Sequence, residues 1–453
     1  MAENSLVERR GFSRRAALLA PLALAAPLAL GGCSLWDSWF GSEKPPLPGK
    51  REPVIASRRG LTVDEGTPKV VLPPPVRNAA WPQAGGNPSH MMGHLAANPV
   101  LAQAWAGDIG AGGGYRHKIL AQPVVANGLV YAMDADAVVS AFALANGARV
   151  WQVDTKDKDA DSTNVGGGLA VAGDTLYAVN GLADLVALDA AKGTQKWRIS
   201  IGAPGRSAPT VVEGRLFLTT IEDKLLALAA DDGHRIWTYQ AVAATPSVLG
   251  RPAPAFANGL IVAGFSSGEL ACLRAESGNV VWTDNLGGVA AGTSADFSAI
   301  RGRPAISNGR VIATGMGGLT LALDLPTGRR LWERAVGGED SPWVAGDWVF
   351  MVALSQDLTA INAADGRVAW VAALPRWEEP EKQKYSISWW GPALLGDRLV
   401  VTGTSNDALS ISPYTGDILG RQTLSDAAAP LEPVVADGTL LVVSDDARLL
   451  ALR

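Results

Sequence analysis

The stretch Leu-Val-Ala-Leu-Asp-Ala-Ala-Lys-Gly-Thr-Gln-Lys-Trp, residues 185–197, decides the fold because the chain repeats its pattern. A glycine followed four residues later by a tryptophan recurs at Gly147 and Trp151, Gly193 and Trp197, Gly233 and Trp237, Gly278 and Trp282, Gly328 and Trp332, and Gly366 and Trp370. Gly416 continues the series, with Gly420 in place of the tryptophan. Five residues before each glycine stands a large apolar residue, and the residue before that one is small. A repeat of about 40 to 50 residues predicts a propeller or another repeat architecture.

Each repeat predicts four short strands. Asn-Gly and Asp-Gly pairs between apolar runs favour tight hairpins, because both central residues of such turns need positive φ. In the repeat from Ile119 to Asp154, apolar runs predict strands near residues 119–126, 129–134, 138–144 and 149–154. Adjacent strand residues face opposite sides, so the small residue of each repeat is expected on a crowded side. Each repeat is therefore interpreted as a four-stranded antiparallel blade.

The last repeat supplies only three strands. It runs from Pro433 to Leu452, where Ala451 and Leu452 fill the small and large positions. Before the first full repeat, Val100–Trp105 has the pattern of a strand and carries a tryptophan without a preceding glycine turn. We expect this strand to complete the last blade, because closure removes the exposed edges of an open array. The prediction is an all-β, eight-bladed β-propeller of four-stranded antiparallel blades, closed by an N-terminal strand that completes the C-terminal blade.

Composition and charge agree with such a fold and exclude some functions. The 453 residues include 51 Gly, 28 Pro and 15 Trp, which suits short strands joined by turns. The net charge of −5 offers no basic field, so nucleic-acid binding is not expected. Only Cys33 and Cys272 are present, so disulfides do not organise the fold. Cys272 fills a small-residue position of the repeat and is expected to be a buried, unreactive thiol.

The first 32 residues are typical of an export signal. Arginines precede the apolar run from Ala16 to Leu30, which is too short to span a bilayer comfortably. The run ends in Leu-Gly-Gly-Cys33, which resembles the lipobox of bacterial lipoproteins, whose cysteine receives diacylglycerol. We therefore predict a signal peptide over residues 1–32 and lipidation of Cys33. Ser34 resembles the sorting signal for the outer membrane, whereas Arg14 and Arg15 resemble a twin-arginine signal, so the export route stays open.

A proline-rich segment separates the signal from the repeats. From Ser34 to Ala80 the chain carries eight prolines among charged residues, a composition that favours an extended tether. We therefore predict a lipidated cysteine and tether over residues 33–80 and a propeller over residues 81–453.

The repeat also carries a family resemblance. Leu185–Trp197 and Thr320–Trp332 resemble the repeat of pyrroloquinoline-quinone-type propellers. With the lipobox and eight blades, the chain resembles the BamB family of outer-membrane protein assembly lipoproteins over about residues 100–453. The resemblance implies a non-enzymatic scaffold without a cofactor, lipid-anchored at the periplasmic face of the outer membrane. It also implies binding to the POTRA domains of BamA and to other BAM subunits, contact with unfolded outer-membrane proteins, and help in inserting β-barrel proteins.

Two alternatives stay open: a periplasmic quinone-dependent dehydrogenase and another periplasmic propeller adaptor. Resemblance to the dehydrogenases with this repeat would imply a larger chain and a disulfide between adjacent cysteines at the quinone. Cys33 and Cys272 are not adjacent and cannot form it. His90 and His94 have the spacing of metal ligands, but zinc needs a third ligand and a rigid frame. We therefore predict no catalytic, cofactor or metal residues.

Connections between blades are the predicted binding regions. The family resemblance points to the loops that enter blades four and five, although the paired acidic residues that the family carries there are not matched. These loops supply five candidate partner-binding residues, Leu249, Arg251, Asp296, Arg301 and Arg303. The long connection Leu374–Gly391 adds Trp377, Trp389 and Trp390, because tryptophans among charges are typical of interfaces. Packing of Trp389 and Trp390 beneath their own loop is the alternative interpretation.

Overall fold

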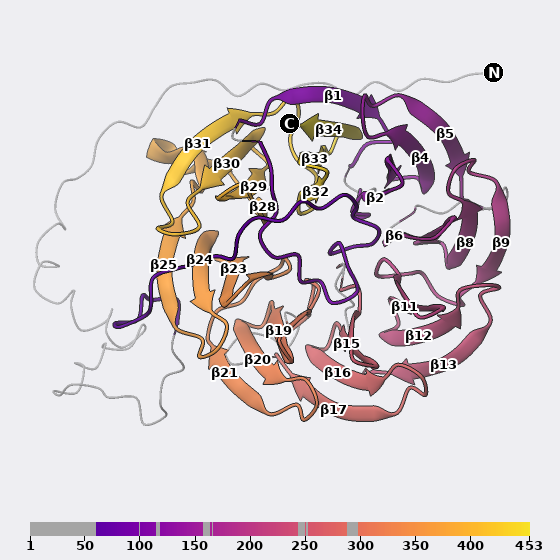
Figure 1. Cartoon of the computed structure of the whole chain (residues 1–453), viewed down its shortest axis with the longest axis horizontal. Coiled ribbons are helices and arrows are strands. Elements are labelled where there is room, and N and C mark those ends of the chain that lie inside the picture. Colours follow the sequence, from indigo (N-terminus) through magenta and orange to yellow (C-terminus); the bar gives the residue numbers. More distant parts are fainter. Residues whose placement is uncertain are drawn as a thin grey trace, which may run out of the picture. The chain divides into compact units, whose positions relative to one another are not determined.

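The computed structural model describes residues 60–98, 100–114, 118–156, 164, 166–242, 250, 252–287 and 298–453. Within this part, eight four-stranded antiparallel sheets surround one axis as the blades of a propeller (Figure 1). The predicted eight-bladed fold is therefore confirmed. Among the described residues, no helix is long and apolar enough to cross a membrane. The predicted signal peptide and Cys33 lie outside the described residues.

Each full blade is a meander whose first strand lies nearest the axis and whose fourth forms the rim (Figure 1). The first blade contains β2 (Val124–Ala126), β3 (Leu129–Met133), β4 (Val138–Ala143) and β5 (Arg149–Asp154). The second contains β6 (Gly167–Ala172), β7 (Thr175–Asn180), β8 (Asp184–Asp189) and β9 (Gln195–Ser200). The third contains β10 (Thr210–Val212), β11 (Arg215–Thr219), β12 (Lys224–Ala229) and β13 (Arg235–Gln240).

The next four blades follow the same plan. The fourth contains β14 (Ala255–Ala257), β15 (Leu260–Gly264), β16 (Glu269–Arg274) and β17 (Val280–Asn285). The fifth contains β18 (Ala305–Ser307), β19 (Arg310–Gly315), β20 (Leu319–Asp324) and β21 (Arg330–Arg334). The sixth contains β22 (Trp343–Ala345), β23 (Trp348–Val352), β24 (Asp357–Asn362) and β25 (Val368–Ala373). The seventh contains β28 (Trp389–Leu395), β29 (Arg398–Gly403), β30 (Asp407–Ile411) and β31 (Ile418–Thr423).

The eighth blade joins the two ends of the propeller. It contains β32 (Val434–Ala436), β33 (Thr439–Val443), β34 (Arg448–Leu452) and, as its outer strand, β1 (Gln103–Asp108). Trp105 of β1 stands opposite Ala451, and backbone hydrogen bonds in both directions join Ala102 to Arg453. The predicted closing strand is therefore confirmed, although it runs from Gln103 to Asp108 and not from Val100 to Trp105.

A regular bulge explains the small residue of the repeat. In every full blade the pairing of the third and fourth strands shifts by one residue between the small and the large position. The shift puts each tryptophan directly opposite the small residue, as Trp282 is opposite Cys272. A larger side chain there would compete with the indole for the same space, because directly paired residues have closely spaced Cβ atoms.

The glycine of the repeat belongs to the junction between blades. Trp282 of blade four packs on Gly328 of blade five, where a Cβ atom would lie 2.5 Å from the tryptophan ring. Gly328 has a φ of 69°, and the Trp282 indole N–H donates to the Leu325 carbonyl at 2.7 Å. Only glycine meets both demands, close approach and positive φ, without strain. The apolar core is correspondingly divided into clusters, many of which span neighbouring blades.

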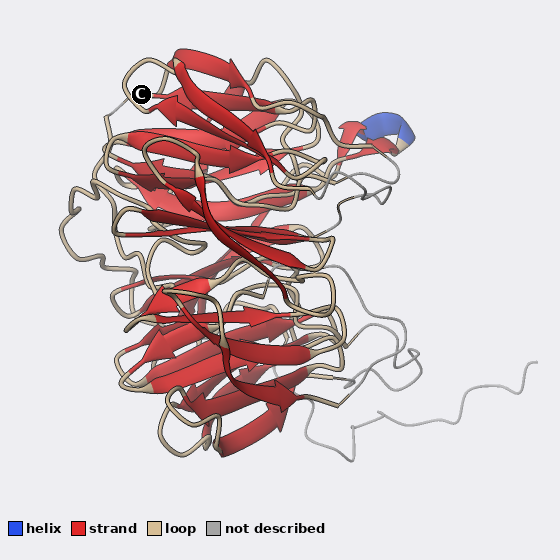
Figure 2. Cartoon of the chain, turned by 90° about the vertical axis from the view of Figure 1, so that its right-hand side faces the viewer, coloured by secondary structure: helices blue, strands red, loops and turns tan. Residues whose placement is uncertain are grey.

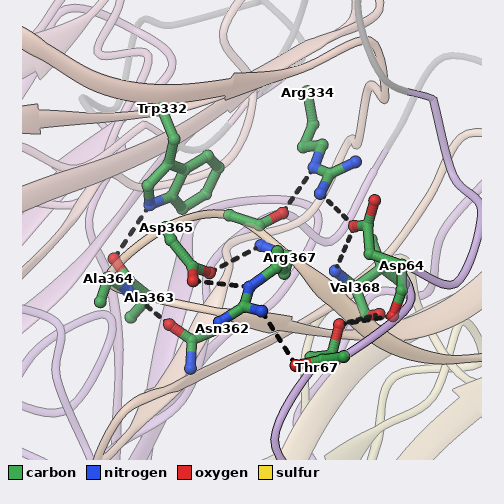
Figure 3. A network of polar contacts seen from close by, with 12 residues as sticks. Asp64, Thr67, Trp332, Arg334, Asn362, Ala363, Ala364, Asp365, Arg367 and Val368 are labelled. Atoms are coloured by element: carbon green, nitrogen blue, oxygen red, sulfur yellow. Dashed lines mark hydrogen bonds and ion pairs between the residues drawn. The ribbon is translucent and has the colours of Figure 1, made fainter.

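The segment before the first repeat differs from the prediction. Residues 60–80 were expected to be part of a free tether, but Val70 is buried and Asp64 pairs with the buried Arg334 at the rim of blade five (Figure 3). The Asp64 carboxylate also accepts from the Val368 N–H in blade six. Residues 76–96 then lie over the centre of the ring (Figure 1), and we call them the axial cap. The described part of the predicted tether is thus folded against the propeller.

Candidate partner-binding face

One face of the propeller carries the connections from each outer strand to the next inner strand, and we call it the loop face. A short hairpin projects from this face between blades six and seven (Figure 2). The connections between blades three and four and between blades four and five contain Leu249, Arg251 and Asp296, which lie outside the described residues. Of the eight predicted partner-binding residues, the structure therefore places Arg301, Arg303, Trp377, Trp389 and Trp390.

The hairpin is a two-stranded sheet outside all of the blades. It consists of β26 (Trp377–Glu379), the 3-10 helix η2 (Pro380–Lys382) and β27 (Lys384–Ser386). Trp377 is half-buried opposite Ser386, whereas the Tyr385 side chain is 64% exposed and has a φ of 56°. A positive φ at a bulky aromatic residue is unusual and occurs preferentially at functional positions.

The two neighbouring tryptophans at the base of the hairpin have different surroundings. Trp389 is 2% exposed, and its indole N–H donates to the Pro375 carbonyl at 2.7 Å. Its backbone N–H donates to the Gln356 side chain at 2.7 Å. Trp389 is therefore a packing residue that fixes the hairpin base, which corrects its assignment as a surface contact. Trp390 is half-buried and lines a pocket on the loop face.

Arg301 links the connections that enter blades five and six. Its guanidinium pairs with the Glu339 carboxylate at 2.5 Å, and its side chain remains 22% exposed. Arg301, Trp389 and Trp390 all line one pocket, so the structure brings together three of the predicted residues.

Arg303 lies deeper and is not available to a partner. Its side chain is 4% exposed and pairs with the equally buried Glu432 of blade eight at 3.3 Å. Glu432 also accepts from the backbone N–H and the hydroxyl of Ser341, at 3.1 and 3.0 Å. The arginine therefore joins three blades at the axis. This corrects its predicted role, and sequence reasoning missed the burial because its carboxylate partner is far away in the chain.

The pocket between these connections has a volume of about 130 Å³. Its walls include Arg301, Glu339, Gln356, Ser388, Trp390 and Pro430. The combination of an ion pair, an amide, a hydroxyl and an indole suits the side chains of a folded partner, because interface centres pair aromatic anchors with a few polar groups. Glu339 and Gln356 carry no repeat signal and were missed, although both are polar residues at strand ends near the loop face.

A small cavity lies at the axis of the propeller. Beneath the axial cap lies a cavity of about 20 Å³ lined by Trp81, His90, Gln122, Arg303 and Glu432 among others. This volume holds about one water molecule. Burial and, second, the charge of Arg303 lower the pKa of His90 to about 3, so the ring is neutral. The residues of this cavity therefore do not fit a tricyclic quinone, and no redox step is derived for it.

Other reactive side chains have structural surroundings. Cys272 is fully buried, as predicted, and burial raises the pKa of its thiol to about 12. The Nδ1 atoms of His90 and His94 are hydrogen-bonded to the carbonyls of Pro304 and Pro73, respectively. Among the described residues, Asp231, Asp232 and His234 bring possible metal-ligand atoms within 4.8 Å of one another, but all three are exposed. Such a surface cluster by itself is not evidence for a metal site.

Known proteins resemble this chain in sequence and in fold. The outer membrane protein assembly factor BamB of Salmonella typhimurium is 28% identical over 353 residues, covering 77% of this chain and 88% of that protein. The BamB of Xanthomonas campestris is 28% identical over 356 residues, covering 77% and 85%. The crystal structure of BamB from Moraxella catarrhalis matches with a TM-score of 0.66 at 19% identity, covering 78% of this chain and all of that one.

The fold alone does not separate scaffolds from enzymes. The quinohemoprotein alcohol dehydrogenase of Comamonas testosteroni matches with a TM-score of 0.63 at 14% identity, covering 83% of this chain and 81% of that one. The family is identified from the sequence, because the family model described as outer membrane protein assembly factor BamB matches residues 135–372. With the repeat, the closed ring and these relatives, this match assigns the chain to the BamB family.

Proposed function

We propose that this chain is a non-enzymatic scaffold of the outer-membrane β-barrel assembly machinery. It binds the POTRA domains of BamA through its loop face and assists the insertion of β-barrel proteins. The observation that carries the proposal is the pocket between Arg301, Glu339 and Trp390, in a chain whose family is named for outer-membrane protein assembly. Contacts with other subunits and with unfolded outer-membrane proteins belong to the same proposal.

The loop face offers chemistry for a protein partner. The Arg301–Glu339 pair is partly exposed, so a partner can compete for either charge, and Trp390 adds an aromatic wall. The hairpin beside the pocket presents Tyr385, the most exposed aromatic side chain of this region. Aromatic and arginine side chains dominate the energetics of protein interfaces.

Co-purification tests the contact with BamA. Arg301→Glu places two carboxylates together, and Trp390→Ala removes the aromatic wall, so each variant should recover at least about tenfold less BamA than the wild type. Arg215→Glu is the matched control, because Arg215 is also partly exposed and paired with a glutamate, Glu213, but belongs to β11 of blade three. Equal recovery of BamA by all variants, with unchanged thermal unfolding, would refute the proposed contact.

Anchoring is a separate part of the proposal. Cys33 is proposed to carry the lipid that holds the mature chain at the periplasmic face of the outer membrane, with residues 34–59 as the remaining tether. Cys33→Ala should abolish labelling with radioactive palmitate and move the protein out of the membrane fraction. Undiminished labelling of this variant would contradict lipidation at Cys33.

A quinone-dependent dehydrogenase is the competing function. The small axial cavity argues against it, since it holds about one water molecule. Adding pyrroloquinoline quinone and calcium to the purified protein should give no tight binding and no dye reduction with alcohols. Saturable quinone binding with dye reduction would favour the enzyme instead.

A further inference from the structure

The axial cap makes one complete circuit of the propeller axis. It meets the blades in their order around the ring, from blade eight through blades one to six and finally blade seven. The circuit closes on itself, because Val76 and Leu95 pair in parallel, with the Val76 N–H bound to the His94 carbonyl and the Ala96 N–H bound to the Val76 carbonyl, both at 2.9 Å. Figure 1 shows this segment as the indigo trace over the centre of the ring.

The cap binds an equivalent position in every blade. This position is the penultimate residue of the innermost strand, just before the hairpin turn. The eight residues are Val125, Val171, Val211, Phe256, Ile306, Val344, Leu394 and Val435. In five of them the backbone N–H donates to the cap, to acceptors at Trp81, Pro82, Gln83, Pro88 and Ser89. In the other three the carbonyl accepts from the cap, from Gly93, Leu95 and the Asn78 side chain.

These bonds satisfy an edge that each blade would otherwise leave open. The innermost strand of each blade is paired on one side only, so the backbone groups on its unpaired side face the axis. Unpaired backbone groups buried in the centre of a protein are costly, and natural folds cover such edges. The cap covers eight edges with one chain segment.

Side chains fix the cap in its circuit. Trp81 is 1% exposed and stacks on Trp343 of blade six, with ring centroids 6.1 Å apart, while its backbone binds blade one. The buried Gln83 side chain accepts from the Val211 N–H at 2.9 Å. His90 and His94 are also buried, and the His94 Nε2 atom accepts from the Asp397 N–H at 3.1 Å.

We propose that the axial cap is a second ring-closing clasp, which holds all eight blades at the axis while β1 closes the ring at the rim. The two devices are consecutive in the chain but act at different radii, so neither depends on the contacts of the other. The cap also closes the centre of the propeller, and no polypeptide can thread through the axis while it is bound. This inference does not depend on the proposed partner.

Native cleavage between the two devices tests the clasp. A site for a sequence-specific protease, inserted after Asn98, allows the cap to be cut from β1 in the folded full-length protein. The N-terminal fragment should stay with the propeller through size-exclusion chromatography and separate only in denaturant. Release of the fragment from a propeller that stays monomeric and folded would overturn the proposal.

Hydrogen exchange provides a second readout that does not depend on cleavage. In a Trp81→Ala, Gln83→Ala double variant, the amides of Val125, Val171 and Val211 should exchange at least tenfold faster than in the wild type. The amide of Val139, inside the ladder of blade one, serves as the internal reference and should not change. Arg77→Ala is the control variant, because the exposed Arg77 side chain pairs with Asp437 in blade eight and not with blades one to three. Unchanged exchange at all three amides would overturn the clasp.

Discussion

At the scale of single residues, the fold rests on one repeated steric unit. A small residue faces a tryptophan across a bulge, and a glycine of the next blade receives the same indole. Gly420 is the one exception among the seven full blades, because it replaces the tryptophan in blade seven. The eighth blade takes its fourth strand from β1, so it has no turn between third and fourth strands to receive a tryptophan from blade seven. A Cβ atom at Gly420 would meet nothing within 4 Å.

The tryptophan of one junction should therefore carry much of its stability. Trp282→Ala removes a buried indole and leaves the Leu325 carbonyl without its donor. We expect a loss of about 3–5 kcal/mol in the free energy of unfolding, measured by urea denaturation. Ile236→Ala, on the exposed rim of blade three, is the control and should cost less than about 1 kcal/mol. Equal effects of the two substitutions would contradict this account.

His90 should make the folded state sensitive to acid. Burial lowers its pKa to about 3 in the folded protein, from the ordinary 6.5 of an exposed histidine, so between these values the unfolded chain binds a proton that the folded chain does not. Above pH 6.5, His90 does not lower the free energy of unfolding. Between pH 6.5 and about 3, that free energy falls by up to about 1.4 kcal/mol per pH unit. His90→Asn removes this contribution, and asparagine tolerates the φ of 59° found there. A difference between variant and wild type that does not change with pH would contradict the prediction.

At the scale of elements, the N-terminal segment is the part whose behaviour differs most from its sequence pattern. Prolines and charges suggested a free tether, yet residues 60–98 are anchored at the rim by Asp64 and at the axis by the cap. The anchor is a buried pair, since Arg334 is 2% exposed and Asp64 is 16% exposed. The Arg334 guanidinium also donates to the Gly366 carbonyl.

Removing one charge of this pair should be worse than removing both. Asp64→Ala leaves a buried guanidinium without its carboxylate and should cost roughly 2–3 kcal/mol, somewhat less than for a fully buried pair. Adding Arg334→Met should restore much of that loss, because no buried charge then remains unpaired. Thermal unfolding and proteolysis of residues 60–75 measure both effects. A double variant less stable than the single one would contradict this role for the pair.

The repeat pattern predicts the blades and the closing strand but not the axial cap. Blades and the closing strand could be predicted because blades one to six repeat the same pattern of a small residue, a glycine and a tryptophan, and Trp105 carries that signal into β1. The cap could not be predicted, because it binds the blades mostly through backbone groups, for which Pro82, Pro88 and Ser89 serve equally well. The burial of Arg303 depends on Glu432, which comes close only after the ring has closed.

At the scale of the whole molecule, the two ends of the propeller differ in structure. The cap covers the axis from the end near the first hairpin turns of the blades, where it binds the residue before each turn. The loop face carries the pocket and the projecting hairpin (Figure 2). If the chain is the proposed scaffold, a capped end opposite an end that carries a pocket predicts that partners bind at the loop face.

Photo-crosslinking from both ends of the molecule tests this claim most directly. A photoreactive amino acid is placed on the loop face at Glu339, Gln356 or Tyr385, and on the hairpin turns at the capped end at Asn127, Asn258 or Asn308. BamA should be captured from the loop-face positions and not from the turns of the capped end. Capture of BamA from the turns, with none from the loop face, would contradict the account.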